Sequence, residues 1–314
     1  MNNAPTPVTA GTVLVGADGT PESDAALRWA ARQAVARGAR VTALTAWSVE
    51  HWPRAIDGAL APTDRHSLAV AAAQLLDGAI RRAEAWGISA PIDPALVEGH
   101  PVAALLEAAS TTKATGGPPT EAIVVGARHS GPARRLASSV GEGVVRHAHV
   151  PVVVVRGSDT DGLGHRRRVV VGVDGSMSSA AAVRWAARAA ADRGVPLRVV
   201  HAWGGHNPLY SDMLLASEAT LERLSREIVE SAVKRGLDGA PEVEVEVEVE
   251  PVVSPRSPAI ALLHEAADAQ LLVVGRHGHG GFTDLALGSV SHQCLLYAPC
   301  TTAIIRDEET DGVE

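Results

Sequence analysis

A cluster of glycines followed by a serine, between residues 275 and 289, has the residue types and spacing best suited to chemistry in this 314-residue chain. Glycine stands at Gly275, Gly278, Gly280, Gly281 and Gly288. Glycines without a Cβ let main-chain N–H groups approach phosphate oxygens. A helix that begins at Gly288-Ser289-Val290 adds its first amides and the positive end of its dipole. We therefore predict an anion site that binds phosphate groups.

The side chains within this segment leave some roles open. Ser289 either donates its hydroxyl to the same phosphates or caps the helix. Arg276 is the better candidate for charge pairing with them, whereas His277 and His279 either touch phosphate or are solvated. The alternative for the whole segment is a Gly-rich surface loop. Its position, after a strand-like apolar run and before a helix start, favours phosphate binding.

An internal repeat indicates which elements position these glycines. The segment at 13–47 recurs at 169–203 with a constant offset of 156, and a second pair, 122–140 and 271–290, closes each copy. Each copy alternates β-branched runs with Ala-rich amphipathic stretches, which is the pattern of a parallel α/β sheet. We predict domains at 1–157 and 165–307, a polar linker between them and an acidic tail at 308–314.

The repeat predicts the same elements twice. In the second copy we expect strands near 168–174, 197–203, 243–250, 271–275 and 301–305, and helices near 177–194, 212–236, 257–268 and 288–298. In the first copy we expect strands near 12–18, 41–47, 92–98, 121–126 and 151–155. The tract EVEVEVEVE at 242–250 alternates strictly, so its Glu face should meet solvent or counter-charges near a sheet edge. The fold class is therefore α/β, two tandem doubly wound five-stranded parallel sheets with helices on both faces.

Composition excludes several classes of function. The formal charge of −8 disfavours nucleic-acid binding, and the basic cluster at 165–168 is predicted to be a solvated linker end. No apolar run is long enough to span a membrane, and the start of the chain does not resemble a signal peptide. Cys294 and Cys300 fit neither a metal site nor a disulfide framework, so we expect buried, reduced thiols in a cytoplasmic protein.

These residues carry a resemblance to a known family. The pattern Gly275-x2-Gly278-x9-Gly288-Ser289 resembles the G-2x-G-9x-G-[ST] nucleotide motif of the universal stress protein family, and VGVDGS at 171–176 resembles that family's first strand and turn. The tandem arrangement is similar to its actinobacterial two-domain members. The resemblance implies strand order 3-2-1-4-5, ATP with or without Mg²⁺ at the switch point, dimer-like packing of the two halves, and a regulatory role in stress or dormancy.

The resemblance also implies roles for individual positions of the second copy. Asp174 matches the acidic residue beside the adenosine, for which an Asx turn is the alternative interpretation. Gly172 lies beside it, and Ala202 falls where the main chain of the second strand meets the adenine edge. The glycine segment supplies the phosphate and ribose loop and the helix start, with Gly275, Gly278, Gly280, Gly281, Gly288, Ser289 and Val290.

The first copy departs from this motif. Its candidate residues are Gly16, Asp18, Ala46, Gly126, Ser138 and Ser139. With Ser139 aligned to Ser289, two motif glycines become His129 and Ser138, and their Cβ atoms stand where the main chain should approach phosphate. We expect a weaker site there, or a purely structural half.

Catalysis is not indicated by the sequence. There is no P-loop, no three-glycine dinucleotide fingerprint, no G-x-S-x-G, no H-E-x-x-H and no metal-ligand spacing, so no catalytic or metal-binding residue is assigned. The prediction is an ATP-binding regulator without nucleic-acid or membrane partners. The alternatives are an adenylyl-transfer enzyme and a scaffold that binds no nucleotide. The apolar final strands at 152–155 and 303–305 suggest that the halves pair within one chain and that two chains form a homodimer.

Overall fold

The computed structural model describes residues 11–56, 64–88, 90–114, 117–127, 139–157, 168–204, 217–238, 247–278 and 287–306. The chain divides into two compact units, Met1–Val124 and Val125–Glu314. The domains expected at 1–157 and 165–307 follow the sequence repeat and stay a prediction. The spatial division falls earlier, because α4 (Ser139–His147) and β5 (Val152–Val155) of the first copy pack within the second unit.

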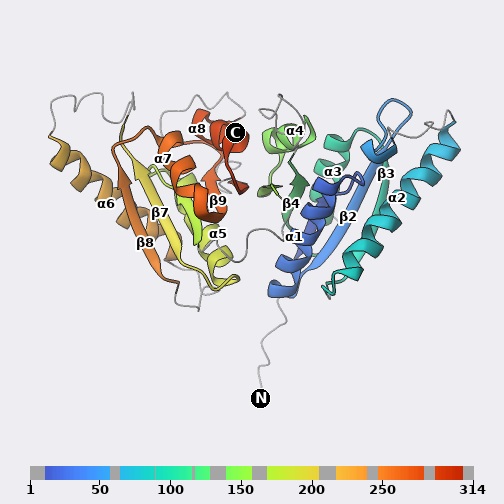
Figure 1. Ribbon diagram of the computed structural model, residues 1–314, viewed down its shortest axis with the longest axis horizontal. Coiled ribbons are helices and arrows are strands. Elements are labelled where there is room, and N and C mark those ends of the chain that lie inside the picture. The colour runs from blue at the N-terminus through green and yellow to red at the C-terminus, as the bar shows by residue number, and fades with distance from the viewer. Residues whose placement is uncertain are drawn as a thin grey trace, which may run out of the picture. The chain divides into compact units, whose positions relative to one another are not determined.

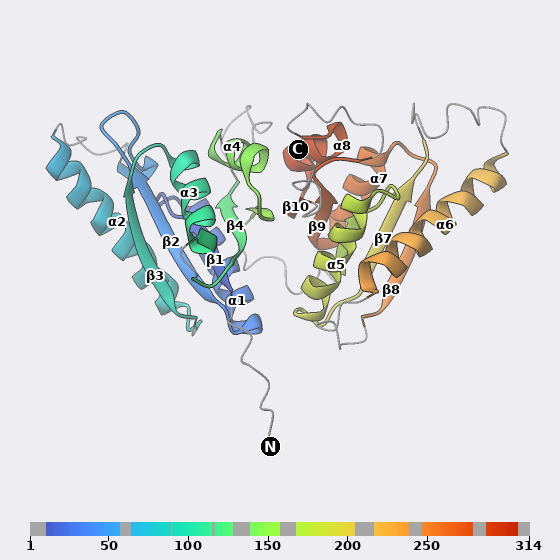
Figure 2. The same cartoon turned by 180° about the vertical axis from the view of Figure 1, so that it is seen from behind.

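The first unit is built on a parallel sheet in which β3, β2, β1 and β4 are neighbours in that order. Its elements in chain order are β1 (Thr12–Gly16), α1 (Pro21–Arg37), β2 (Arg40–Trp47), the short 3-10 helix η1 (Arg54–Ile56), α2 (Arg65–Ala85), β3 (Ile92–Glu98), α3 (Pro101–Ala114) and β4 (Thr120–Gly126), whose last two residues belong to the second unit. Helices α1 and α2 lie in front of this sheet in Figure 1, and α3 lies in front of it in Figure 2.

The second unit contains the second copy and the end of the first. After α4 and β5 its elements are β6 (Arg168–Gly172), α5 (Met177–Ala191), β7 (Leu197–Ala202), α6 (Glu218–Leu237), β8 (Val249–Ser254), α7 (Pro258–Glu265), the 3-10 helix η3 (Ala266–Asp268), β9 (Ala269–Gly275), α8 (Ser289–Tyr297) and β10 (Thr301–Ile305). The strand order β8-β7-β6-β9-β10 is the expected 3-2-1-4-5, and all four pairings are parallel. Helices α5 and α6 pack together on one face, and α7 packs with α8 on the other (Figures 1 and 2).

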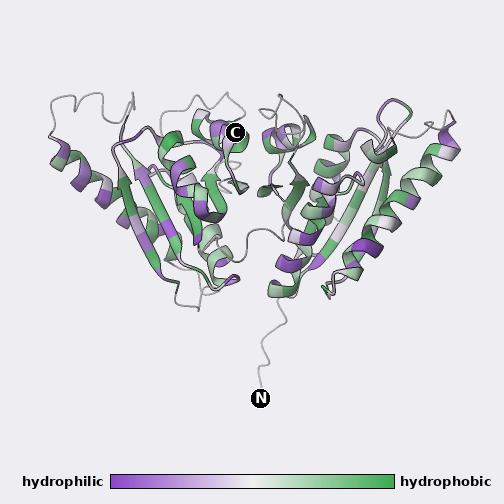
Figure 3. Ribbon diagram, in the orientation of Figure 1, coloured by the Kyte–Doolittle hydropathy of each residue, from purple (hydrophilic) through white to green (hydrophobic). Residues whose placement is uncertain are grey.

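Apolar side chains of the central strands form the core of each unit. The valines at 169–171 of β6 and the leucines and valines at 271–274 of β9 are buried, and the β-branched residues of β5 and β10 are buried throughout. Continuous apolar runs of this kind fit strands that are covered on both faces. Figure 3 shows the same concentration of hydrophobic residues along the strands, with hydrophilic residues on the outer faces of α2 and α6.

The last strands of the two copies pair with each other. In β5 and β10 the pairing is antiparallel, with Val153 opposite Ala303, whereas β10 runs parallel to β9 on its other side. A strand edge left unpaired is a template for aggregation. Each of these strands therefore covers the edge of the other.

The Val/Glu tract forms a strand later in the chain than predicted. Strand β8 covers Val249–Ser254, where 243–250 was expected, and the part of the tract at 242–246 lies outside the described residues. The register explains the shift, because Leu197 to Ala202 of β7 pair with Val249 to Ser254. Pro251 is tolerated because β8 ends the strand order and is an edge strand.

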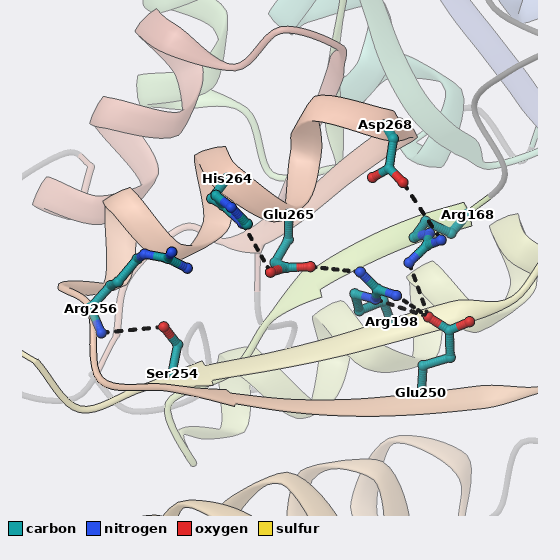
Figure 4. A network of polar contacts seen from close by, with 8 residues as sticks. All are labelled: Arg168, Arg198, Glu250, Ser254, Arg256, His264, Glu265 and Asp268. Atoms are coloured by element: carbon teal, nitrogen blue, oxygen red, sulfur yellow. Dashed lines mark hydrogen bonds and ion pairs between the residues drawn. The ribbon is translucent and has the colours of Figure 1, made fainter.

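Glu250 of β8 is bound by counter-charges, and Figure 4 shows it within a network of ion pairs. Arg198 of β7 binds Glu250 at 2.6 Å and Glu265 at 2.7 Å, and Arg168 of β6 binds Glu250 at 3.3 Å. Asp268 adds a contact with Arg168 at 3.5 Å. The expectation of counter-charges is confirmed for Glu250. The expectation of a solvated linker end is wrong for Arg168, whose side chain is only 18% exposed.

Both cysteines are buried and free, as expected for their thiols. Burial raises the pKa of the Cys294 thiol to about 12. A thiol with such a pKa is almost entirely protonated at neutral pH and is a poor nucleophile. The structure therefore gives Cys294 a role in packing the core.

Candidate functional site

The carboxyl ends of three neighbouring strands meet at one edge of the second unit. Gly172, Ala202 and Gly275 are the last residues of β6, β7 and β9, and β6 lies between the other two strands with parallel pairing on both sides. The chain leaves β6 toward α5 on one face and leaves β9 toward α8 on the other. The strand order thus reverses between β6 and β9, which is where open α/β sheets bind ligands.

Asp174 is fixed by hydrogen bonds directly after β6. Its Oδ1 accepts from the Ser176 main-chain N–H at 3.0 Å, from Ser176 Oγ at 2.7 Å and from Ser179 Oγ at 2.6 Å. The first of these bonds is the Asx turn that was the alternative interpretation of this residue. Gly175 between them has φ +89°, which favours glycine. Ser176 also caps α5 through the Ser179 N–H, so the carboxylate is held rigidly at the helix start.

Two glycines of the predicted loop lie so close to this turn that a side chain at either position would force neighbouring atoms to shift. A Cβ on Gly278 would lie 2.3 Å from Asp174 Oδ2, and a Cβ on Gly275 would lie 2.7 Å from Ser178 Oγ. Real Cβ atoms do not come this close to oxygen, so a side chain at either position would displace the carboxylate or the first turn of α5. The glycines that were predicted from sequence to carry the phosphate loop thus lie against Asp174.

The two ends of this loop are joined to each other. The Gly288 N–H donates to Arg276 O at 3.0 Å, and the Arg276 N–H donates to Ile305 O at 2.7 Å. A Cβ on Gly288 would lie 3.3 Å from Arg276 O and 3.5 Å from His277 Cα, so a larger side chain would enter the space between the ends. Gly280, Gly281 and His279 lie outside the described residues.

Helix α8 begins at the far end of the loop. Gly288 is its N-cap residue and makes no side-chain capping bond, so Ser289 occupies the first turn and its side chain is exposed. The cap role considered for Ser289 is therefore wrong, since the cap position is one residue earlier. The first N–H groups of a helix, here those of Ser289 and Val290, have no acceptor within the helix and carry partial positive charge.

Ser179 and Ser291 belong to the site but were not assigned to it from the sequence. Ser179 Oγ binds Asp174, and Ser291 Oγ donates to Gly275 O at 2.6 Å, which ties α8 to the end of β9. The available signal was the serine spacing at 176 and 179 after Asp174, and at 289 and 291 after the last glycine.

His201 holds the main chain just before Asp174. Its ring is 1% exposed and Nδ1 lies 2.7 Å from Val173 O. Because a carbonyl only accepts, Nδ1 carries the proton in this bond. Burial lowers the pKa of the His201 imidazole. His201 is therefore a buried residue whose ring nitrogen has a hydrogen-bond partner, and Ala202 beside it is buried at 5% exposure.

The Arg276 side chain binds main-chain oxygens of this same chain. Its Nη2 donates to Arg146 O and its Nη1 lies 3.5 Å from Ala148 O, both at the carboxyl end of α4. The predicted charge pairing of Arg276 with phosphate is untested and stays a prediction. In the described geometry the guanidinium satisfies helix carbonyls.

The first copy repeats the turn after its first strand. Asp18 Oδ1 accepts from Thr20 N–H at 3.1 Å and from Thr20 Oγ1 at 2.6 Å, and Thr45 takes the place of His201 by donating to Ala17 O at 2.7 Å. Gly16 and Ala46 end or nearly end β1 and β2 in the first unit. Gly126 and Ser139 belong to the second unit, whereas Ser138 and the side chain of Ser139 lie outside what the structure describes.

Among the described residues, none of the helices has the length and apolarity that a membrane span requires. The same residues contain no group of three or more His, Cys, Asp or Glu side chains arranged to hold a metal ion.

Comparisons with known proteins agree with this architecture. The sequence profile of the Universal stress protein family matches residues 10–156 and again residues 165–306. Universal stress protein Rv1996 of Mycobacterium tuberculosis is 34% identical over 294 residues, covering 89% of this chain and 90% of its own length. A universal stress protein of Mycolicibacterium smegmatis is 32% identical over 304 residues, covering 94% and 96%.

Solved structures show the same fold. A universal stress protein from Archaeoglobus fulgidus superposes with a TM-score of 0.64 at 19% identity, covering 95% of this chain and 97% of its own. A putative universal stress protein from Pseudomonas aeruginosa has a TM-score of 0.61 at 16% identity, covering 96% and 95%. With both copies matched by the family profile and relatives similar along most of its length, this chain belongs to the universal stress protein family as a tandem two-domain member.

Proposed function

We propose that the second copy binds ATP at the edge formed by β6, β7 and β9. The observation that carries the proposal is the approach of Gly278 to Asp174, where a Cβ would lie 2.3 Å from Oδ2. A main chain stripped of side chains, beside a fixed carboxylate and at the start of α8, is suited to a ligand that joins an adenosine to phosphates. The residues present therefore fit the nucleotide that the family motif implies.

Each part of the site has a distinct role in this proposal. The N–H groups at the start of α8 bind phosphate oxygens, and the exposed Ser289 hydroxyl adds a donor. The Asp174 carboxylate and the main chain at Ala202 hold the adenosine, while Gly280 and Gly281 complete the loop. Mg²⁺ enters as part of the nucleotide complex, bound mainly by phosphates and water.

We further propose that nucleotide binding regulates the interactions of the protein and does not supply energy for catalysis. Hydrolysis requires a positioned base and charge stabilisation near the γ-phosphate, and the sequence offers no such set. ATP can shift a conformational equilibrium only through its difference in affinity for the two states. In this role the protein is a cytoplasmic regulator of a stress or dormancy response, in which occupancy changes its interactions.

The first copy is proposed to bind nucleotide more weakly. Its sequence has His129 and Ser138 at positions where the second copy has glycines, and each of these residues carries a Cβ that glycine lacks. A titration of the full chain should then give close to one strong ATP site. Two equal sites would contradict this ranking.

Pairing of the two halves and assembly into a homodimer are also proposed. The apolar final strands at 152–155 and 301–305 supply the contact between halves, and a homodimer requires a further surface. Light scattering of the purified chain gives the oligomeric state directly. A monomer at micromolar concentration would remove the homodimer from the proposal.

The test of nucleotide binding uses the intact protein in two ways. Mass spectrometry of small molecules released from the purified, denatured chain should detect an adenine nucleotide, and calorimetry of the stripped protein should show saturable ATP binding. Timed conversion of ATP with and without candidate acceptors separates a regulator from an adenylyl-transfer enzyme. Failure of both binding measurements would refute the proposal and leave a scaffold.

A further inference from the structure

Arg276 links the proposed nucleotide loop to a segment of the first copy. Its main chain closes the loop, with the carbonyl accepting from Gly288 N–H at 3.0 Å and the N–H donating to Ile305 O at 2.7 Å. Its side chain leaves the loop and binds Arg146 O and Ala148 O at the end of α4. One residue therefore belongs to the loop by its main chain and to α4 by its guanidinium.

The carboxyl end of α4 is a suitable acceptor for this cation. The last carbonyls of a helix have no N–H partner within the helix and carry the negative end of its dipole. Arg306, which directly follows β10, shares the acceptor Ala148 O at 3.5 Å. Two arginines of the second copy thus hold one helix end of the first copy.

The helix that follows the loop is attached to the same segment at its carboxyl end. Helix α8 begins at Ser289, and its last carbonyls, those of Leu295 and Leu296, accept from Arg156 Nη2. Arg156 directly follows β5, and β5 follows α4 in the chain. Arg276, at the start of the loop, therefore binds the α4–β5 segment, and Arg156 of that segment binds α8, the helix that follows the loop.

At the equivalent position of the first copy, the described residues show only the main-chain part of this connection. Ala127 follows Gly126 as Arg276 follows Gly275, and its N–H makes the equivalent bond to Val155 O at 2.8 Å. The main-chain bond is common to both copies, but the side chain of Ala127 is a methyl group and cannot donate a hydrogen bond. The link made by this position runs only from the loop of the second copy to α4 of the first.

We infer that Arg276 is a positioning residue that couples nucleotide occupancy of the second copy to the order of α4. A ligand that fixes the loop also fixes Arg276, and Arg276 then restrains the carboxyl end of α4. This rests on the proposed ATP site. It names the element through which occupancy of that site is passed to the first copy.

The experiment follows amide hydrogen exchange of residues 139–148 in the full chain, with and without saturating ATP. In the wild type, ATP should slow exchange of this segment roughly fivefold, at the lower end of usual coupling factors. Arg276→Ala places the residue of the first copy at this position. It should raise the ATP Kd roughly threefold to tenfold and reduce the effect of saturating ATP on α4 to less than twofold.

Arg306→Ala is the matched control, because it removes a bond to the same Ala148 carbonyl and lies outside the glycine segment at 275–289. It should speed exchange of α4 without nucleotide and keep the roughly fivefold effect of ATP. Arg276→Lys, which keeps the charge and loses the fork, replaces Arg276→Ala if that variant fails to fold.

The outcomes separate this inference from the proposed function. An ATP effect on α4 that persists in Arg276→Ala, or that is missing in a wild type shown by calorimetry to bind ATP, overturns the coupling alone. A wild type that shows no ATP binding overturns both the site and the coupling. The contact of Arg276 with α4 can then still be tested without nucleotide. Equal hydrogen exchange of α4 in the wild type and in Arg276→Ala would show that this contact does not restrain α4.

Discussion

Replacing Gly278 with alanine is the sharpest test of the proposed site. A Cβ at this position would lie 2.3 Å from Asp174 Oδ2, whereas ordinary contacts begin at 3.4 Å, so the carboxylate or the loop must move by about 1 Å. The left-handed backbone region is not involved, because Gly278 is not among the glycines with positive φ. The change therefore acts through space alone.

The magnitude follows from the bonds that hold Asp174. Its Oδ1 accepts three hydrogen bonds from Ser176 and Ser179 at 2.6–3.0 Å. Bonds to a charged group contribute about 1.5–3 kcal/mol each. If the shift of the carboxylate costs ATP one contact of this strength, the Kd rises by roughly 10-fold to 150-fold at about 1.4 kcal/mol per decade.

Calorimetric titration with ATP measures this effect, and Gly78→Ala is the control. Gly78 lies within α2, where a Cβ would be no closer than 3.4 Å to Arg82 Nη1, so alanine fits and should stabilise the helix by about 0.5–1 kcal/mol. Its ATP affinity should match the wild type. Gly278→Ala binding ATP as tightly as Gly78→Ala would refute the argument from the close approach.

Three further changes have definite expected outcomes. Gly288→Leu should abolish calorimetric ATP binding while circular dichroism stays native, because its side chain enters the base of the loop. Burial lowers the pKa of His201 below 6.5, so the unfolded chain binds more protons than the folded one. The free energy of unfolding should therefore fall as the pH drops below 6.5, by at most about 1.4 kcal/mol per pH unit. Urea unfolding of His201→Thr should show a flatter pH profile in this range. Glu250→Gln should lower the free energy of unfolding by about 1–2 kcal/mol, measured by thermal melting. Asp93→Asn should lower it by less, because the Asp93–Arg40 ion pair is about half exposed.

Strand periodicity and the repeat carried most of the fold prediction. Strands β3 and β10 begin and end at the predicted residues, 92–98 and 301–305, because their apolar patterns end at turn or polar residues. The pattern at 242–250 was misleading, since alternation continues only as far as Glu250 while the pairing with β7 carries the strand to Ser254. Pro251 appeared to end the strand, but at a sheet edge its missing N–H breaks no ladder.

Local spacing predicted the site residues but not their long-range partners. The glycine spacing and the switch-point rule together placed Gly275 and Gly278 at the sheet edge where Asp174 lies. The bond from Ser291 to Gly275 O and the contact of Arg276 with α4 join residues 16 and 130 positions apart. Such contacts depend on how whole elements pack, and a pattern read within one copy carries no information about an element of the other.

The pairing of β5 with β10 has a consequence for how the chain is made. Strand β10 belongs to the second copy and leaves the ribosome well after β5, which belongs to the first. The nascent first copy therefore carries an uncovered row of valines until β10 has been synthesised. A message cut short before Thr301 would release a product with that row permanently open to other chains.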